Sequence, residues 1–81
     1  MLEEVRSLLG STLRLGARTA SLKADTPLLG NLPELDSMAV VAVITALEEH
    51  YGFSVSDDEI SADTFATLGS LADFVKEKLA T

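Results

Sequence analysis

The 81-residue sequence contains no cysteine and no tryptophan, and it has only one histidine and one tyrosine. The lack of cysteine excludes a disulfide scaffold, thiolate metal ligands, thiol catalysis and cysteine-bound iron–sulfur clusters. The lone histidine, His50, has no second imidazole with which to form a metal centre or a proton relay. Because aromatic residues make up only 5% of a chain that is 47% hydrophobic, aliphatic side chains must form most of the core.

Positive charge is missing from most of the chain. Residues 25–75 contain ten acidic residues and no lysine or arginine, and the formal net charge of the whole sequence is −7. This excess disfavours nucleic acid and anionic membrane surfaces as partners, and it favours proteins with basic docking surfaces. Solubility alone is an alternative explanation for the acidity.

Long apolar runs are also absent. The longest, over residues 38–46, is interrupted by Thr45 and is far shorter than the ~20 residues that a membrane span needs. Glu3 and Glu4 occupy positions where a secretory signal would carry positive charge. We therefore expect a cytoplasmic protein without stable membrane insertion, folded as one domain over residues 1–81.

Two amphipathic helices are predicted near the ends of the chain, over about residues 2–15 and 68–79. Gly16 is a candidate for the residue that ends the first helix, and Thr67 is a candidate cap for the last. The spacing of three and four residues predicts that the following side chains face the core: Leu2, Val5, Leu8, Leu9 and Leu13 in the first helix, and Leu68, Leu71, Phe74, Val75 and Leu79 in the last.

A strongly apolar helix is predicted over about residues 37–51, with Asp36 or Ser37 as its cap and Gly52 as its stop. Its predicted core positions are Val40, Val41, Ile44, Leu47 and Tyr51. Ser56 and Glu59 have the spacing of a capping box, which predicts a short helix over about residues 57–63.

The remaining long segment, residues 16–35, contains Pro27, Gly30 and Pro33 and shows no sustained period, so we predict an ordered loop with one short turn near residues 20–22. Four leucines are predicted to anchor this loop between the helices: Leu22, Leu28, Leu29 and Leu32. The predicted fold class is all-α, a small four-helix bundle with three longer helices, a short third helix and a long loop between the first two.

Groups that could support catalysis are scarce. His50 lies beside Glu48 and Glu49 on the side of the helix expected to face solvent. The acidic residues 57–59 and Asp63 lack the spacing and central glycine of a calcium-binding loop. No metal-ligand set, phosphate-binding glycine loop or catalytic triad is recognisable, and we expect the chain itself to catalyse nothing.

Ser37 is the residue whose placement suggests chemistry. It lies at the start of a helix, directly after a long loop, so its hydroxyl is an accessible attachment point. A phosphodiester formed there would lie near the positive end of the helix dipole. The alternative is that Asp36 or Ser37 serves only as a helix cap.

The sequence LDSM at residues 35–38, followed by ALEE at 46–49 and an aromatic residue at Tyr51, resembles the second helix of acyl carrier proteins. The resemblance extends to the order of the helices, the long first loop, the acidic start of the third helix and the entry to the last helix through TLGSL at residues 67–71.

This resemblance implies that Ser37 receives a 4′-phosphopantetheine arm from coenzyme A, attached by a separate magnesium-dependent phosphopantetheinyl transferase. Asp36 matches the family's acidic residue that the transferase recognises. The thiol of the arm would carry an acyl group as a thioester for acyl- or aminoacyl-activating and acyl-transfer enzymes. We expect a monomer that binds neither metal nor nucleic acid.

Two departures from the family pattern concern partner choice. Pro33-Glu34-Leu35 replaces a pair of small residues, and Ala39 and Ala42 occupy positions where fatty-acid carriers usually have acids. We therefore expect a more apolar partner surface and weak docking to general fatty-acid enzymes. The candidate partner-binding residues are Met38, Ala39, Ala42, Glu48, Glu49, Asp57 and Asp58.

Two alternatives to an acyl carrier remain open on the sequence. LDSM also occurs in D-alanyl carrier proteins, so an aminoacyl or peptidyl-type cargo is one alternative. The stretch from Thr26 to Glu49 resembles a bacterial carrier subgroup associated with exosortase and exopolysaccharide gene clusters. The other alternative is a helical interaction module that is never modified.

Overall fold

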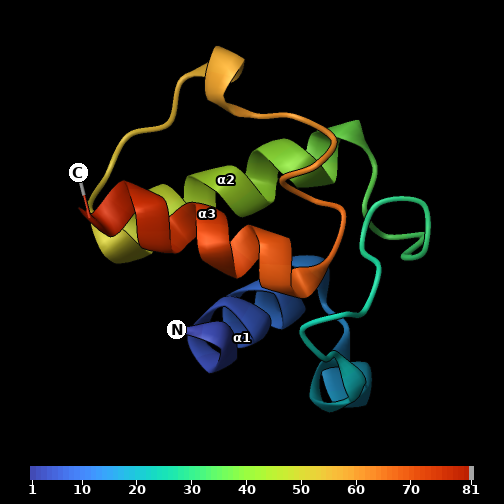
Figure 1. Ribbon diagram of the computed structural model, residues 1–81. Helices are drawn as coiled ribbons and strands as arrows, with labels where there is room; N and C mark the ends of the chain where they lie inside the picture. The colour runs from blue at the N-terminus through green and yellow to red at the C-terminus, as the bar shows by residue number, and fades with distance from the viewer. Residues whose placement is uncertain (81) are drawn as a thin grey trace.

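The computed structural model describes residues 1–80, except for the side chain of Asp57. Helix α1 (Leu2–Leu13) is followed by the 3₁₀-helix η1 (Gly16–Ser21), and helix α2 (Ser37–Tyr51) by the 3₁₀-helix η2 (Asp57–Glu59); helix α3 (Leu68–Ala80) ends the fold (Figure 1). No strand occurs among these residues, and a single antiparallel bridge joins Pro27 to Thr67. The predicted all-α class is confirmed.

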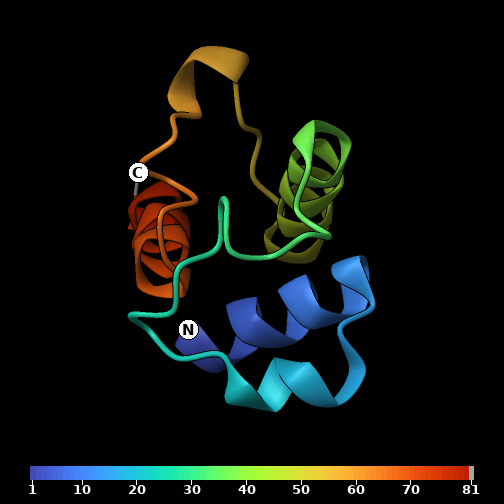
Figure 2. The same ribbon diagram turned by 90° about the vertical axis from the view of Figure 1, so that its right-hand side faces the viewer.

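Helix α1 is the element on which both other long helices pack. Figure 2 shows α2 and α3 nearly end-on, with α1 crossing beneath both of them. The side chains that fill the space between these helices are aliphatic except for Phe65, and they come from all three long helices and from the segments that connect them. Those with no more than 1% of their surface exposed are Val5, Leu9, Leu28, Val43, Leu47, Phe65, Leu68, Leu71 and Val75. Each such side chain contributes about 1.5–3 kcal/mol of hydrophobic free energy relative to an exposed position.

Helix α1 ends two residues earlier than predicted, and Gly16 is not the residue that ends it. Arg14 adopts the left-handed conformation (φ 57°), its N–H bonds to the Ser11 carbonyl, and the Leu15 N–H bonds to the Gly10 carbonyl at 2.9 Å. This pair of bonds is a Schellman motif, which buries the following Leu15 against the core. Burial of Leu15 accounts for a stop at Arg14 where a glycine was expected.

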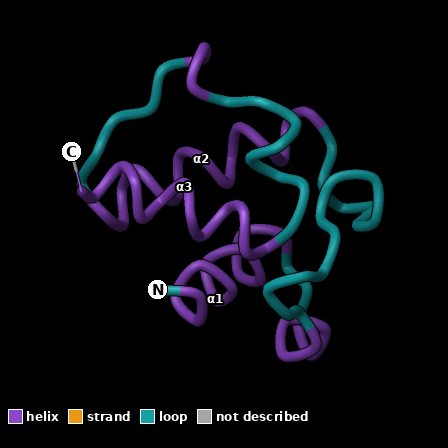
Figure 3. Tube along the Cα trace, viewed as in Figure 1, coloured by secondary structure: helices purple, strands orange, loops and turns teal. Residues whose placement is uncertain are grey.

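The loop predicted over residues 16–35 begins instead with the six-residue 3₁₀-helix η1 (Figure 3). This helix lies very close to α1, because a Cβ atom added to Gly10 would come within 2.2 Å of the Thr19 Oγ1. Leu22 and Leu28 are buried as predicted and Leu32 is half-buried, but Leu29 is exposed and does not anchor the loop.

Backbone hydrogen bonds tie the rest of this loop to the segment that enters α3. The N–H groups of Leu28 and Leu29 donate to the carbonyls of Ala66 and Phe65, both at 3.0 Å. In return, the N–H groups of Leu68 and Gly69 donate to carbonyls of residues 26 and 24. A long loop is tolerated in so small a fold because its buried backbone groups have these partners.

The third helix is much shorter than the predicted range 57–63, since only Asp57–Glu59 form a single 3₁₀ turn. The predicted capping interaction is present from one side: the Glu59 carboxylate accepts the Ser56 N–H at 2.8 Å. Residues 61–66 then form successive turns. Ile60 is the one large apolar residue between 57 and 63, so a longer helix here would have little apolar surface to bury.

Thr67 caps α3 as predicted. Its Oγ1 accepts the Ser70 N–H, and the Ser70 hydroxyl accepts the Thr67 N–H, both at 3.0 Å. Within α3, Phe74 is half-buried, and Leu79, which was predicted to face inward, is exposed.

The buried face of α2 differs from the predicted one by a fraction of a turn. Val43 and Leu47 are buried, whereas Val41, a predicted core residue, is 64% exposed. Val40, Ile44 and Tyr51 are partly buried against the core. Because α2 is apolar on nearly all sides between residues 38 and 47, the spacing of its apolar residues does not select one face.

Substitution of Leu47 by alanine should destabilise the fold by about 2–5 kcal/mol, because it leaves a cavity in the core. Substitution of Val41 by alanine should change the unfolding free energy by no more than about 0.5 kcal/mol, because Val41 contacts solvent. Denaturant unfolding followed by circular dichroism measures both. Similar losses for the two variants would contradict the observed orientation of α2.

Candidate functional site

The start of α2 is formed by Asp36 and Ser37. Asp36 has an extended backbone (φ −100°, ψ −174°), and its carboxylate Oδ1 accepts the Ala39 N–H at 2.8 Å. Asp36 is therefore the helix cap. The sequence alone had allowed either Asp36 or Ser37 in this role. Since the cap is provided by Asp36, the Ser37 hydroxyl is not required for the stability of the helix end.

Ser37 is exposed, and its hydroxyl has no hydrogen-bond partner within residues 1–80. The backbone beneath it is well anchored, because Leu35 is buried in the core two residues before it and α2 begins at Ser37 itself. An anchored backbone combined with an unbonded hydroxyl presents the oxygen to other proteins in a defined position. The N-terminal end of α2 would also favour a phosphodiester on this oxygen.

The one histidine of the sequence lies too far from Ser37 to activate its hydroxyl. His50 is on the same helix but thirteen residues further along, which at 1.5 Å per residue is about 20 Å away. Its ring packs edge-on against Tyr51, with centroids 4.7 Å apart. The geometry suits a hydroxyl that is modified by another protein.

The segment before the serine is linked to η1 by an ion pair between Arg18 Nη2 and Glu34 Oε2. The hydrogen bond from Arg18 holds the pKa of the Glu34 carboxyl below its usual range. The sequence singled out Glu34 only as a departure from the family pattern, and no pattern in the sequence points to Arg18 as its partner.

The solvent-facing side of α2 near the serine is apolar. Met38 is 80% exposed, and Val41, Ala42 and Thr45 continue the exposed surface at helical spacing. Of the predicted partner-binding residues, Met38 and Ala42 are on this surface, whereas Ala39 is half-buried and packs against the core.

The acidic residues of the predicted partner surface differ in their exposure. Glu49 and Asp58 are exposed, but Glu48 is half-buried, and its carboxylate accepts the Val55 N–H at 2.7 Å. Glu48 thus fastens the chain that follows α2. Asp57 was also predicted to bind partners, but its side chain lies outside the described part of the structure.

A small groove of about 270 Å³ lies beside Glu48, between α2 and residues 55–60. Its lining is mostly aliphatic: Val40, Val41, Ile44, Thr45, Glu48, Val55, Ser56 and Ile60. The groove was not predicted, because it depends on where the chain after Gly52 folds back onto α2. An apolar group of a few carbon atoms would fit its size and chemistry.

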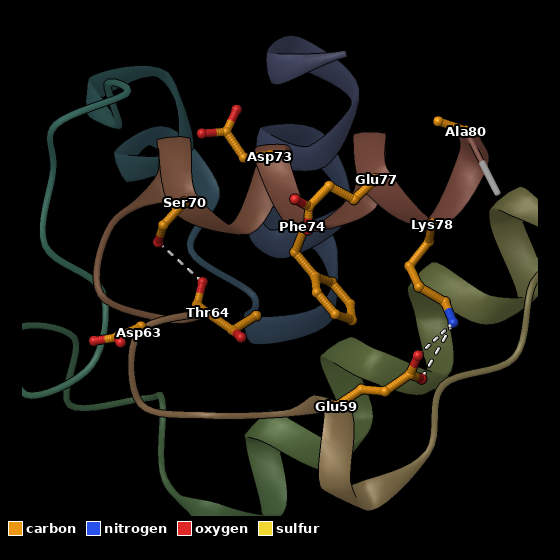
Figure 4. Close-up of a pocket in the computed structure, with 9 residues that line it drawn as sticks. All are labelled: Glu59, Asp63, Thr64, Ser70, Asp73, Phe74, Glu77, Lys78 and Ala80. Carbon is orange, nitrogen blue, oxygen red and sulfur yellow. Dashed lines mark hydrogen bonds and ion pairs between the residues drawn. The ribbon is translucent and has the colours of Figure 1, made fainter.

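A wider, more open groove of about 1030 Å³ lies between α3 and residues 59–64 (Figure 4). Lys78 and Glu59 face one another across it, with Lys78 Nζ 2.8 and 3.1 Å from the two carboxylate oxygens. Two hydrogen bonds lower the pKa of Glu59: the one from Lys78 has the larger effect, and the one from the Ser56 N–H has the smaller. This ion pair joins η2 to the C-terminal end of α3.

Tyr51 connects the far end of α2 to α1, because its hydroxyl donates a 3.3 Å hydrogen bond to Glu4 Oε1. Burial raises the pKa of Tyr51, and the nearby Glu4 carboxylate raises it further by a smaller amount.

Within residues 1–80, no group of three or more histidine, cysteine or acidic side chains could hold a metal ion. None of the helices in this part of the chain has the length and apolar character needed to cross a membrane.

Comparison with known proteins agrees with this geometry. The sequence family described as "Phosphopantetheine attachment site" matches residues 3–75. A solution structure of a holo acyl carrier protein from Nitrosomonas europaea is 66% identical, with a TM-score of 0.91; the match covers 99% of this chain and 96% of that chain. No curated protein sequence gives a significant match.

Substitution of Asp36 by alanine should lower the unfolding free energy of the unmodified protein by about 1 kcal/mol, in the range of 0.5–2 kcal/mol, because it removes the cap of α2. Ser37→Ala should change it by no more than about 0.5 kcal/mol. Denaturant unfolding of both variants, with Asp58→Ala as an exposed acidic control, measures the difference. A larger loss for Ser37→Ala would show that the hydroxyl takes part in capping.

Proposed function

Since the chain belongs to the acyl carrier protein family, with a phosphopantetheine attachment domain over residues 3–75, we propose that its 4′-phosphopantetheine arm is attached to Ser37. The arm supplies the thiol that this cysteine-free chain lacks, and it holds acyl groups as thioesters. The observation that supports Ser37 is its exposed, unbonded hydroxyl at a helix start that Asp36 already caps.

Asp36 has two roles in this proposal. Its carboxylate orients the first turn of α2 and thereby positions the serine, and it provides the acidic group that a phosphopantetheinyl transferase recognises. Because only one of its oxygens is engaged in the cap, the exposed carboxylate can still accept a bond from another protein.

The chain contributes presentation, and its partner enzymes contribute catalysis. A phosphopantetheinyl transferase loads the arm from coenzyme A, and acyl- or aminoacyl-activating and acyl-transfer enzymes load and unload the cargo. The proposal covers one carrier domain over residues 1–81 that acts in the cytoplasm and has no catalytic activity of its own.

The docking surface for these enzymes is the exposed side of α2 next to the serine. Between Ser37 and Leu47 this helix has no charged residue, and its exposed side chains there are Met38, Val41, Ala42 and Thr45. The acidic residues Glu49 and Asp58 lie beyond it. We propose that partners bind chiefly through apolar contact near the serine, with electrostatic attraction further along the helix.

Attachment is tested by intact mass after incubation with coenzyme A, magnesium and a promiscuous phosphopantetheinyl transferase. The wild type should gain one phosphopantetheine, and the gain should be absent in Ser37→Ala. Ser54→Ala, which changes another exposed serine, should be modified like the wild type. A wild type that gains no mass would favour an unmodified interaction module, and a modified Ser37→Ala would place the arm on another residue.

Docking is tested by malonyl transfer to the holo form with a general fatty-acid malonyltransferase. The wild type should be a poor substrate, because α2 lacks charge near the serine. Val41→Glu combined with Ala42→Glu should raise kcat/KM, mainly at low ionic strength, because charges at the edge of an interface act on the association rate. Both positions are exposed, so the fold should be retained.

The matched control is Val41→Gln with Ala42→Gln, which changes side-chain size and polarity without adding charge. A wild type that already matches a standard fatty-acid carrier, with no gain in the Glu variant, would show that these positions do not govern partner choice.

A further inference from the structure

Residues 30–36, which lead directly into the attachment serine, are held to the rest of the protein by the side chains of Leu32 and Leu35 and by few polar contacts. Before this segment, the N–H groups of Leu28 and Leu29 bond to the chain that enters α3, and at its end Leu35 is buried in the core. The backbone bonds within the segment are local: the N–H groups of Asn31 and Leu32 both donate to the Leu28 carbonyl. Between its two anchored ends, the segment makes one ion pair to another element among the described residues.

That ion pair joins Glu34 to Arg18, sixteen residues away in η1. Glu34 Oε2 binds the guanidinium, while Glu34 Oε1 is shielded from solvent and has no partner within residues 1–80. The carboxylate is thus engaged through one of its two oxygens, and the side chain as a whole is 31% exposed.

Arg18 is a suitable anchor because η1 is itself fixed to the body of the protein. The backbone N–H of Arg18 donates to the Leu15 carbonyl, and the backbone carbonyl of Arg18 accepts a hydrogen bond from the Ser21 hydroxyl at 2.7 Å. Next to Arg18, Thr19 lies in close contact with Gly10 of α1. The guanidinium therefore connects the segment before the serine to α1 through η1.

This ion pair lies close to the serine, because Glu34 is three residues before Ser37. Three residues span at most about 11 Å, so the pair lies within the area that an enzyme acting on Ser37 must cover. An ion pair that is this exposed contributes little to stability. Its consequence is geometric: it limits where the chain before the serine can lie.

We propose that Arg18 and Glu34 are positioning residues for the modification of Ser37, fixing the segment before the serine so that the transferase meets one arrangement of it. The inference rests on the proposed attachment at Ser37. It adds a requirement outside the helix that carries the serine, and it assigns a role to the residue that departs from the family pattern before Asp36.

Kinetics of phosphopantetheine transfer to Glu34→Gln and Arg18→Gln test this proposal. Each substitution breaks the ion pair, but the first leaves an unpaired positive charge near the serine and the second an unpaired negative charge. If the pair acts by position, both variants should raise KM by about three- to tenfold, with kcat and the thermal midpoint nearly unchanged. If only the local charge matters, the two variants should shift KM in opposite directions, and that result would overturn the proposal.

The exchanged pair, Arg18→Glu with Glu34→Arg, restores an ion pair with the same net charge. Its KM should return to within about twofold of the wild type, and a KM as high as in the single variants would count against positioning. Lys78→Gln and Glu59→Gln break the ion pair between η2 and α3, and they serve as matched controls. Equal KM increases in these controls would show a general effect of loosening the fold.

Failure of this inference is distinguishable from failure of the proposed function. If Ser37 is not the attachment residue, the wild type gains no mass or Ser37→Ala remains a substrate. If attachment at Ser37 is right and positioning is wrong, the wild type and both single variants are all modified at Ser37, and the KM values of the variants are either unchanged or shifted in opposite directions.

Discussion

The buried face of α1 is the constraint on which the rest of the structure depends. Helices α2 and α3 both pack on α1, and Val5 and Leu9 are completely buried between them. The long loop adds a second connection, because residues 24–29 and 65–69 exchange backbone hydrogen bonds. The first connection fixes α2 to α1, and the second fixes the loop that leads toward the N-terminal end of α2. The position of Ser37 therefore depends on packing between residues that are far from it in the sequence.

Local sequence signals predicted the elements whose ends and faces are decided locally. Asp36 and Thr67 cap their helices with side-chain bonds to residues three positions ahead, and the apolar spacing of α1 identified its buried face. Such interactions depend on neighbours in the chain, so the sequence contains the information needed to predict them. The candidate serine was found in the same way, from its position at a helix start and from the resemblance around it.

What the sequence did not predict depends on tertiary contacts. Val41 was assigned to the core because α2 is apolar on nearly all sides, and only packing against α1 determines which side is buried. Arg14 ends α1 because Leu15 has a buried position to occupy, and this outweighs the preference for glycine in the left-handed conformation. The bond from the Val55 N–H to Glu48 and the pairing of Glu34 with Arg18 join residues that no periodic pattern relates.

These tertiary contacts also decide which groups remain available around the serine. The Asp36 carboxylate is engaged with Ala39, Glu34 with Arg18 and Glu48 with Val55. A count of acidic residues would suggest a strongly negative docking surface, yet several of these charges are occupied within the fold. The groups without such partners near Ser37 are its own hydroxyl and the apolar side chains of Met38 and Val41. Apart from the Asp36 carboxylate, the proposed docking therefore relies on shape and apolar contact near the serine, and the other charges act mainly at a distance.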